Sequence, residues 1–351
     1  MYPRAAALAA FLHITLLFAT AASAAPGVSA AGGATAPAPT CQRNSAALPA
    51  VKRLREALAH GRFVAYEPTS LRVVNGEVTS ADPTSIRADL VVLRRSFDAL
   101  VTYDAVHGAE NIPAIAAELR FRALIIGVWN PADGKQLDAA IEAAQRFPQL
   151  VVGISLGNEL LFTHRSDPAA LAALIARTRA RVPGTPLSTS EPFHVYYEPA
   201  VTDLLGRLDF LLVNVHPIFQ PWFRDAPDSN AAQFVVNVLS QLTPRACGPI
   251  LVKETGVPTA PESAGFSETR QAAFYRELRA RLVPSAARAF AYFAAFDAPW
   301  RATDATFVPG ARPGAHPEEA HWGLFDAGRH PKAAARELPP LSTGKPLSPA
   351  N

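Results

Sequence analysis

The sequence predicts a (β/α)8 barrel, the TIM barrel, as a single catalytic domain. Short apolar runs rich in β-branched and aromatic residues alternate with longer segments of helical periodicity from about residue 63 onward. Eight such runs can be counted, and eight parallel strands are the number that closes this barrel. Several runs are apolar throughout, which is typical of parallel strands covered on both faces.

The predicted strands are residues 63–66, 97–103, 123–129, 151–156, 187–190, 210–215, 250–252 and 290–296. Between them, segments 136–147, 168–182 and 267–282 place residues at the i, i+3, i+4, i+7 spacing of an apolar helix face. Asp167 and Pro168 are typical of an N-cap and a first helical residue. A doubly wound open sheet is the alternative, but it often carries a glycine-rich phosphate turn, which this sequence lacks.

The 351 residues divide by composition into four parts. Residues 1–24 have the pattern of a secretory signal: Arg4, then an apolar stretch, then a small-residue cleavage site at Ala22, Ser23 and Ala24. An uncleaved anchor is the alternative. We expect residues 25–45 to be a disordered Ala/Pro/Gly linker, 46–340 the catalytic domain, and 341–351 a disordered tail. The predicted location is periplasmic or secreted, with no membrane attachment after cleavage.

Charge and cysteine content indicate which binding partners and cofactors the sequence favours. The formal net charge of +3 comes from scattered residues rather than a basic cluster, so nucleic acid is not indicated. Cys41 and Cys247 could form a disulfide in an oxidising compartment or remain free thiols, because the sequence does not give their Cα separation. Two distant cysteines make a poor zinc site. We expect a monomer that needs no metal or other cofactor.

Polar residues gather where the predicted strands end, which is where barrel enzymes place their active sites. They are Tyr66, Glu67, Tyr103, Asp104, Trp129, Asn130, Asn158, Glu159, Ser190, Glu191, Asn214, His216, Glu254 and Asp297. Six carboxyl groups at one mouth cannot all be ionised, so we expect some to be protonated, paired or turned away. Carboxylates, amides and aromatic rings without metal-ligand spacing suit carbohydrate chemistry. Glycosidic cleavage requires two carboxyl groups of opposite pKa, but this reasoning does not say which two.

Five sequence motifs indicate which of the six carboxyl groups act in catalysis. They are GISLGNE at 153–159, LVNVHP at 212–217, KETGVP at 253–258, YFAAFDAPW at 292–300 and HWGLF at 321–325. In their order they resemble glycoside hydrolase family 17, a clan A family, in a bacterial type. The resemblance covers roughly residues 60 to 335.

The resemblance implies a role for individual residues. Glu159 matches the general acid/base, Glu254 the nucleophile, and Asn158 the amide that contacts the sugar 2-hydroxyl. The implied enzyme is a retaining β-1,3-glucanase of endo or exo type, and a β-1,3-glucan transglycosylase with the same residues is the alternative. Endo or exo action, linkage and chain-length preference stay open.

Two departures from the family concern residues near this pair. Val101 precedes Thr102 and Tyr103 where the family often has Arg, and His216 stands where Tyr is common. His216 could hydrogen-bond to Glu254 or pack beneath the rim. We expect Tyr66, Tyr103, Asn214, His216 and Trp300 to bind substrate, with Trp300, and secondarily Trp322, as a sugar platform rather than a core residue.

Three other interpretations each fit part of the sequence. Residues 153–157 fit the G-x-S-x-G elbow of a serine esterase, with Ser155 as nucleophile and Asp297 and His321 downstream, but Ser155 lies inside an apolar run rather than on a turn. The cluster from His316 to His321 could suggest a zinc site, but it has neither the H-E-x-x-H nor the H-x-x-E-H spacing of zinc proteases. A catalytically silent glucan-binding barrel is the third.

Overall fold

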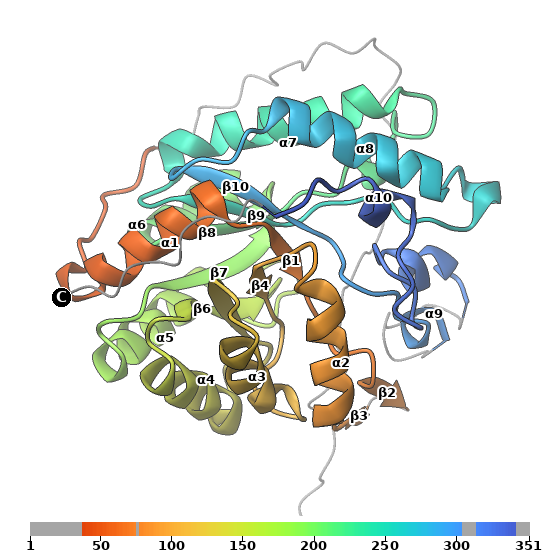
Figure 1. Cartoon of the computed structure of the whole chain (residues 1–351). Helices are drawn as coiled ribbons and strands as arrows, with labels where there is room; N and C mark the ends of the chain where they lie inside the picture. The colour runs from red at the N-terminus through yellow and green to blue at the C-terminus, as the bar shows by residue number, and fades with distance from the viewer. Residues whose placement is uncertain (1–36, 75–76, 304–313, 342–351) are drawn as a thin grey trace, which may run out of the picture.

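The computed structural model describes residues 37–74, 77–303 and 314–341. Within them, parallel strands form a closed barrel in the order β1, β10, β9, β8, β7, β6, β5, β4. The (β/α)8 prediction is therefore confirmed, and Figure 1 shows the helices around the barrel. The predicted signal at 1–24, residues 25–36 of the predicted linker and residues 342–351 of the predicted tail lie outside the described residues.

Each barrel strand overlaps a predicted run. The strands are β1 (Phe63–Ala65), β4 (Ala99–Val101), β5 (Ala123–Val128), β6 (Val151–Asn158), β7 (Leu187–Pro192), β8 (Leu211–Asn214), β9 (Ile250–Glu254) and β10 (Arg288–Tyr292). A hairpin of β2 (Arg72–Val74) and β3 (Glu77–Thr79) follows β1. Strands β6, β7 and β9 extend past their predicted ends because the polar residues there still pair with neighbouring strands.

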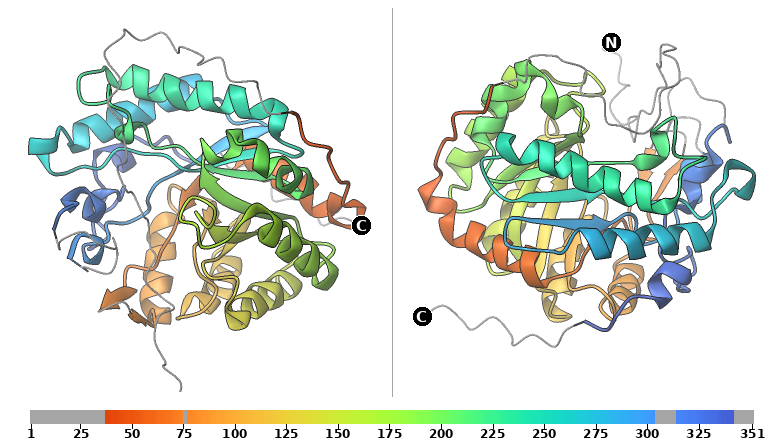
Figure 2. Two further views of the ribbon diagram at one scale, coloured as in Figure 1. Left: turned by 180° about the vertical axis from the view of Figure 1, so that it is seen from behind. Right: turned by 90° about the horizontal axis from the view of Figure 1, so that it is seen from above.

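The helices are α1 (Leu48–His60), α2 (Pro83–Leu93), α3 (Ile112–Glu118), α4 (Gly134–Arg146), α5 (Pro168–Arg181), α6 (Thr202–Arg207), α7 (Asp228–Leu242), α8 (Glu268–Arg281), α9 (Trp300–Thr303) and α10 (Ala333–Arg336). The Asp167 carboxylate caps α5 by accepting a hydrogen bond from the Ala170 backbone N–H at 2.8 Å. Helices α7 and α8 lie side by side in both views of Figure 2. No described helix is long and apolar enough to cross a bilayer.

Helix α1 closes the amino-terminal end of the barrel. Its Leu54, Ala57 and Leu58 form one buried cluster with barrel-interior residues such as Phe63 and Val101. Because α1 leads directly into β1, it lies at the end where the parallel strands begin. The active site is therefore expected at the opposite end of the barrel, where the strands finish.

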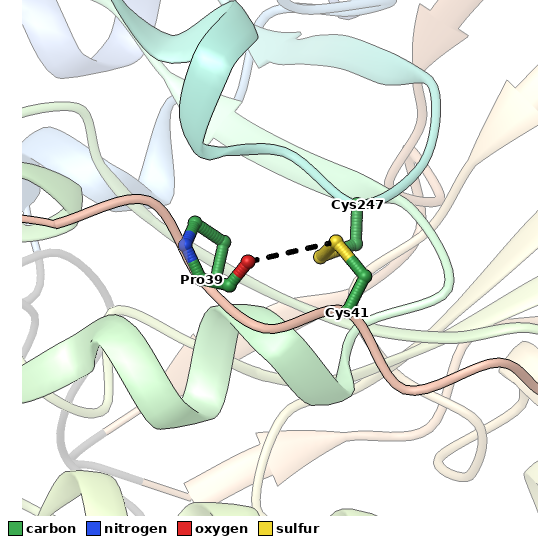
Figure 3. Close-up of a disulfide and its surroundings, with 3 residues drawn as sticks. All are labelled: Pro39, Cys41 and Cys247. Carbon is green, nitrogen blue, oxygen red and sulfur yellow. Dashed lines mark hydrogen bonds between the residues drawn. A yellow bond between two sulfur atoms is a disulfide. The ribbon is translucent and has the colours of Figure 1, made fainter.

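A disulfide joins Cys41 to Cys247, with the two Cα atoms 5.4 Å apart (Figure 3). The Gln42 backbone N–H also donates to the Gly206 carbonyl at 2.8 Å. Residues 37–44 contain no helix or strand, yet these contacts hold them against the barrel. Cys247 lies three residues before β9 begins, so the bond is at the amino-terminal end of the strands.

Candidate active site

Two register shifts direct polar side chains into the carboxyl-terminal mouth of the barrel. Between β8 and β9, Val213 pairs with Val252 but Asn214 pairs with Glu254, which leaves Lys253 as an extra residue. A second shift separates the Ser155 and Asn158 pairings of β6 with β7. Such β-bulges re-aim side chains and are common beside active sites. Adjacent residues Lys253 and Glu254 can therefore both reach the same buried space.

Glu159 follows β6 and is 5% exposed. Its backbone is left-handed, with φ of 55°, and its N–H donates to the Ser190 carbonyl at 2.7 Å. The carboxyl Oε1 accepts a hydrogen bond from Asn214 Nδ2 at 2.9 Å. Burial, and then the negative charge of Glu254, raise the pKa of Glu159 to about 8. This carboxyl is therefore protonated at neutral pH.

Glu254 ends β9 and is fully buried, but its neighbours differ. Lys253 Nζ lies 3.2 Å from Oε1, and His216 Nε2 lies 3.3 Å from Oε2. Burial favours the neutral acid, yet the positive charge of Lys253 and the hydrogen bond of His216 outweigh it and lower the pKa of Glu254 to about 2. One carboxyl is therefore protonated and the other ionised at neutral pH, and the charge of Glu254 helps to keep the proton on Glu159.

Two hydrogen-bond donors accompany the pair. The Tyr103 hydroxyl is buried near Glu254, and burial and the charge of Glu254 raise the pKa of Tyr103 well above its ordinary value. Neither this hydroxyl nor Asn158 Nδ2 makes a hydrogen bond of regular geometry within the described residues. Both are donors beside the carboxyl pair that a bound sugar hydroxyl can use.

The other four strand-end carboxyl groups have protein partners, as the charge argument requires. Glu67 pairs with Arg301 at 2.8 Å, and Asp297 with Lys332 at 2.6 Å. Glu191 accepts from the backbone N–H groups of Leu161 and Phe162 at 3.0 and 3.1 Å, and Asp104 accepts from Ala105 at 2.7 Å. Only Glu159 and Glu254 remain as a pair at the mouth.

Tyr66 does not reach this site, contrary to the sequence-based expectation. It is fully buried, and its hydroxyl donates to Asp89 of α2 at 2.9 Å. Side chains alternate along a strand, and Phe63 of β1 faces the barrel interior, so Tyr66 faces the helix layer. Tyr103 lies two residues beyond the interior residue Val101 and therefore does enter the mouth.

The remaining predicted binding residues differ in their roles. Asn214 holds Glu159, and its Oδ1 accepts from the Ser190 hydroxyl at 2.9 Å, so it positions the acid. His216 contacts Glu254 and also packs on Trp322, with ring centroids 5.1 Å apart. Trp322 is 1% exposed and donates to Glu319, so it is a core residue and not a platform.

Trp300 is 6% exposed and lines a pocket formed mainly by the segments that follow β1 and β10. Glu67, Tyr103 and Arg301 line the same pocket, and Tyr103 links it to the carboxyl pair. A sugar-binding role for Trp300 stays a prediction.

The serine-esterase alternative is not supported by local geometry. Ser155 lies within β6, buried, and its hydroxyl donates to the Gly157 carbonyl at 3.2 Å rather than to an imidazole. Among the residues that the structure describes, no group of three or more His, Cys, Asp or Glu side chains is placed to hold a metal ion.

Sequence reasoning missed Lys253. It is 1% exposed and contacts Glu254, Asn158 and Tyr103. Its only sequence signal is a lysine at the end of an otherwise apolar strand, directly before a carboxylate.

A barrel whose strand ends carry one protonated and one ionised carboxyl group has the equipment of a glycosidase. The family model described as the BtgE/BtgC glycoside hydrolase domain matches residues 64–323. The chain belongs to this family and is a glycoside hydrolase.

The chain is also similar to individual proteins. A glucan 1,3-beta-glucosidase of Arthroderma benhamiae is 25% identical over 276 residues, which are 75% of this chain and 88% of the relative. An active-site mutant of a Rhizomucor miehei beta-1,3-glucanosyltransferase, solved with laminaritriose, superposes with a TM-score of 0.58 at 21% identity, covering 78% of this chain and 96% of the other. An endo-laminarinase from Formosa gives 0.58 at 18% identity, covering 80% and 90%. The structural likenesses show a shared fold.

Proposed function

We propose that this chain is a retaining β-1,3-glucan hydrolase with Glu159 as general acid/base and Glu254 as nucleophile. The observation that carries the proposal is the contrast between two buried glutamates at the barrel mouth: Glu159 accepts a hydrogen bond from a neutral amide, whereas Glu254 lies beside the ammonium of Lys253 and the imidazole of His216. The name of the Arthroderma relative and the laminaritriose in the Rhizomucor structure support β-1,3-glucan as substrate. The bacterial type remains a prediction, since these two relatives are fungal.

The mechanism follows from the two protonation states. The Glu254 carboxylate attacks the anomeric carbon as the glycosidic C–O bond breaks, and Glu159 gives its proton to the departing oxygen. The ionised Glu159 then takes a proton from water, whose oxygen displaces Glu254 and regenerates the enzyme. Asn158 Nδ2 and the Tyr103 hydroxyl donate to sugar hydroxyls or to the nucleophile during these steps.

The test uses paired variants on laminarin-type oligosaccharides. Glu254→Gln and Glu159→Gln are each expected to lose activity by at least about 100-fold. Azide added to Glu159→Ala is expected to give a β-glycosyl azide, and added to Glu254→Ala an α-glycosyl azide, because each fills the place of the missing carboxylate. Ser155→Ala is the control and should keep its activity. Near-native turnover in either glutamine variant refutes the assignment.

A second candidate, β-1,3-glucan transglycosylase, is favoured by an aromatic tract. The tract is Phe162, Phe193, His194, Trp222 and Phe234, whose neighbouring rings meet at centroid distances of 5.4 to 5.6 Å. Phe162 follows Glu159 on the loop after β6, and Phe193 and His194 follow β7. In the strand order, β6 and β7 stand opposite the Trp300 pocket of β1 and β10.

Since Glu159 protonates the departing oxygen, the leaving or acceptor sugar lies on the Glu159 side, where this tract is found. Aromatic faces that retain an acceptor sugar favour transfer over hydrolysis. Product analysis on β-1,3-oligosaccharides decides between them: longer products mean transfer and shorter ones alone mean hydrolysis. Trp222→Ala should lower the transfer share, while Phe147→Ala, at the far end of α4, should not.

We also propose that the protein is exported, as a monomer in the periplasm or medium. The Cys41–Cys247 disulfide supports an oxidising compartment. Amino-terminal sequencing of the mature protein should begin at Ala25, and light scattering should give the mass of one chain. An intact amino terminus in the cytoplasmic fraction contradicts export.

A further inference from the structure

Lys253 stands out because its ammonium is enclosed by functional side chains. It is 1% exposed, and lysine is almost never fully buried unless its charge is paired. Nζ lies 2.6 Å from Asn158 Oδ1, 3.2 Å from Glu254 Oε1 and 4.2 Å from the Tyr103 ring centroid. The ammonium therefore has three partners: a carboxylate, an amide oxygen and the face of an aromatic ring.

We propose that Lys253 is the positioning residue of this site: its ammonium fixes the orientation of the Asn158 amide and keeps Glu254 ionised for attack. The inference rests on the proposed function and adds Lys253 as a residue that acts through Asn158 and Glu254.

The effect on Asn158 follows from donor and acceptor chemistry. An ammonium can only donate, so the atom of Asn158 that faces it must be the amide oxygen. Nδ2 is thereby turned away from Lys253, and it is buried without a hydrogen-bond partner among the described residues. An asparagine side chain on its own can present either end. Asn214 Nδ2 donates to the same oxygen at a longer 3.4 Å, so the shorter contact of Lys253 is the main reason that Asn158 offers a donor, rather than an acceptor, to a sugar hydroxyl.

The effect on Glu254 follows from charge. The titratable groups around this carboxylate are Lys253, His216, Tyr103 and Glu159. Glu159 and Tyr103 are neutral at working pH, so neither supplies a cation. His216 donates one hydrogen bond, and Lys253 supplies the largest of the effects that lower the pKa of Glu254 against burial. Without the ammonium, a fully buried carboxyl becomes harder to ionise and loses nucleophilicity.

The test compares Lys253→Met and Lys253→Gln with the full-length wild-type enzyme in kcat/KM against pH. Methionine keeps the bulk of lysine but has no charge, so Glu254 should ionise only at higher pH. The acidic limb of the kcat/KM profile should then move into the range above pH 4, and activity at pH 5 should fall about tenfold or more. Glutamine can still donate to Asn158, so it should show the same limb shift with a smaller loss of kcat. In combination with Asn158→Ala, the methionine variant should lose less than the product of the two single losses.

Lys332→Met is the matched control, because Lys332 is a second buried lysine whose ammonium pairs with Asp297 instead of Glu254. It should leave the acidic limb unchanged. Thermal unfolding of each variant separates positioning from folding: a merely structural role would lower the melting temperature without moving the limb. An unshifted limb and unchanged kcat in both Lys253 variants overturn the inference, whereas a wild type inactive on glucan overturns the proposed function instead.

Discussion

Glu159 accepts a hydrogen bond from a neutral amide, whereas Glu254 faces an ammonium and an imidazole. Because the proposed mechanism needs Glu159 protonated and Glu254 ionised, activity should fall as pH rises through about 8 and as it falls toward about 2. We therefore expect a broad plateau in kcat/KM with its alkaline limb near pH 8. Rates from pH 4 to 10 on a β-1,3-oligosaccharide measure it, and a flat profile to pH 10 would contradict the assignment of Glu159 as acid.

Glu159 should also make stability depend on pH. Its pKa is raised in the folded protein above the ordinary 4.5, so the folded state holds the proton more tightly. This contribution is complete below about pH 4.5 and is lost as pH rises through about 8. Glu159→Gln keeps an oxygen for Asn214 and never ionises, so its stability advantage over wild type should grow between pH 5 and 9, by on the order of a few kcal/mol.

Denaturant unfolding at several pH values checks this prediction. Glu254→Gln is the contrasting variant: the pKa of Glu254 is lowered, so its stabilising contribution is present across pH 5 to 9 and is lost only in strong acid. Its difference from wild type should vary less over that range than that of Glu159→Gln, because it removes only the part of the Glu159 pKa shift that the charge of Glu254 causes. Parallel pH curves for wild type and Glu159→Gln would mean that Glu159 is not buried as an acid.

Sequence motifs located both glutamates but not their surroundings. Tyr66 and Tyr103 both follow a predicted strand, and only side-chain alternation relative to Phe63 and Val101 separates them. That alternation requires exact strand ends, which apolar runs do not fix. Lys253 was missed because a lysine normally marks a solvated surface, and its burial depends on partners on or directly after two other strands, β6 and β4.

At the scale of elements, the strands and the major helices could be predicted because their signals are local. The N-cap Asp167 and the apolar spacing within 136–147 determine α5 and α4 almost at their observed bounds. The bulges of β6 and β9 could not be predicted, because a register shift is a property of two strands and not of either sequence. The site depends on those bulges.

The loop after β6 offers a test of how an element positions the acid. Glu191 of β7 accepts hydrogen bonds from the backbone N–H groups of Leu161 and Phe162, which lie two and three residues after Glu159. Glu191→Ala leaves these buried donors without partners, so we expect a stability loss of about 1–3 kcal/mol and a lower kcat as Glu159 shifts. Asp167→Ala, which removes only the α5 cap, should cost about 1 kcal/mol and leave kcat unchanged. Equal kcat in both variants would show that the loop holds its shape without Glu191.

At the scale of the whole molecule, the barrel separates stability from chemistry. The amino-terminal end is closed by α1 and tied by the disulfide, and the carboxyl-terminal end carries the glutamates. Barrel enzymes generally divide their two ends in this way, because the loops after the strands can vary without disturbing the interior. Changes at the first end should therefore act on unfolding rather than on turnover.

The disulfide provides that test. It links residues 206 apart in sequence, so it restricts the unfolded chain strongly, and its loss should cost about 2–5 kcal/mol. The double variant Cys41→Ser, Cys247→Ser should unfold at a lower temperature yet keep wild-type kcat and KM below its transition, because Cys247 precedes β9 while Glu254 ends it. Calorimetry and initial rates on the same samples measure both quantities. Reduced kcat at a temperature where the variant is fully folded would show that the two ends of the barrel are coupled.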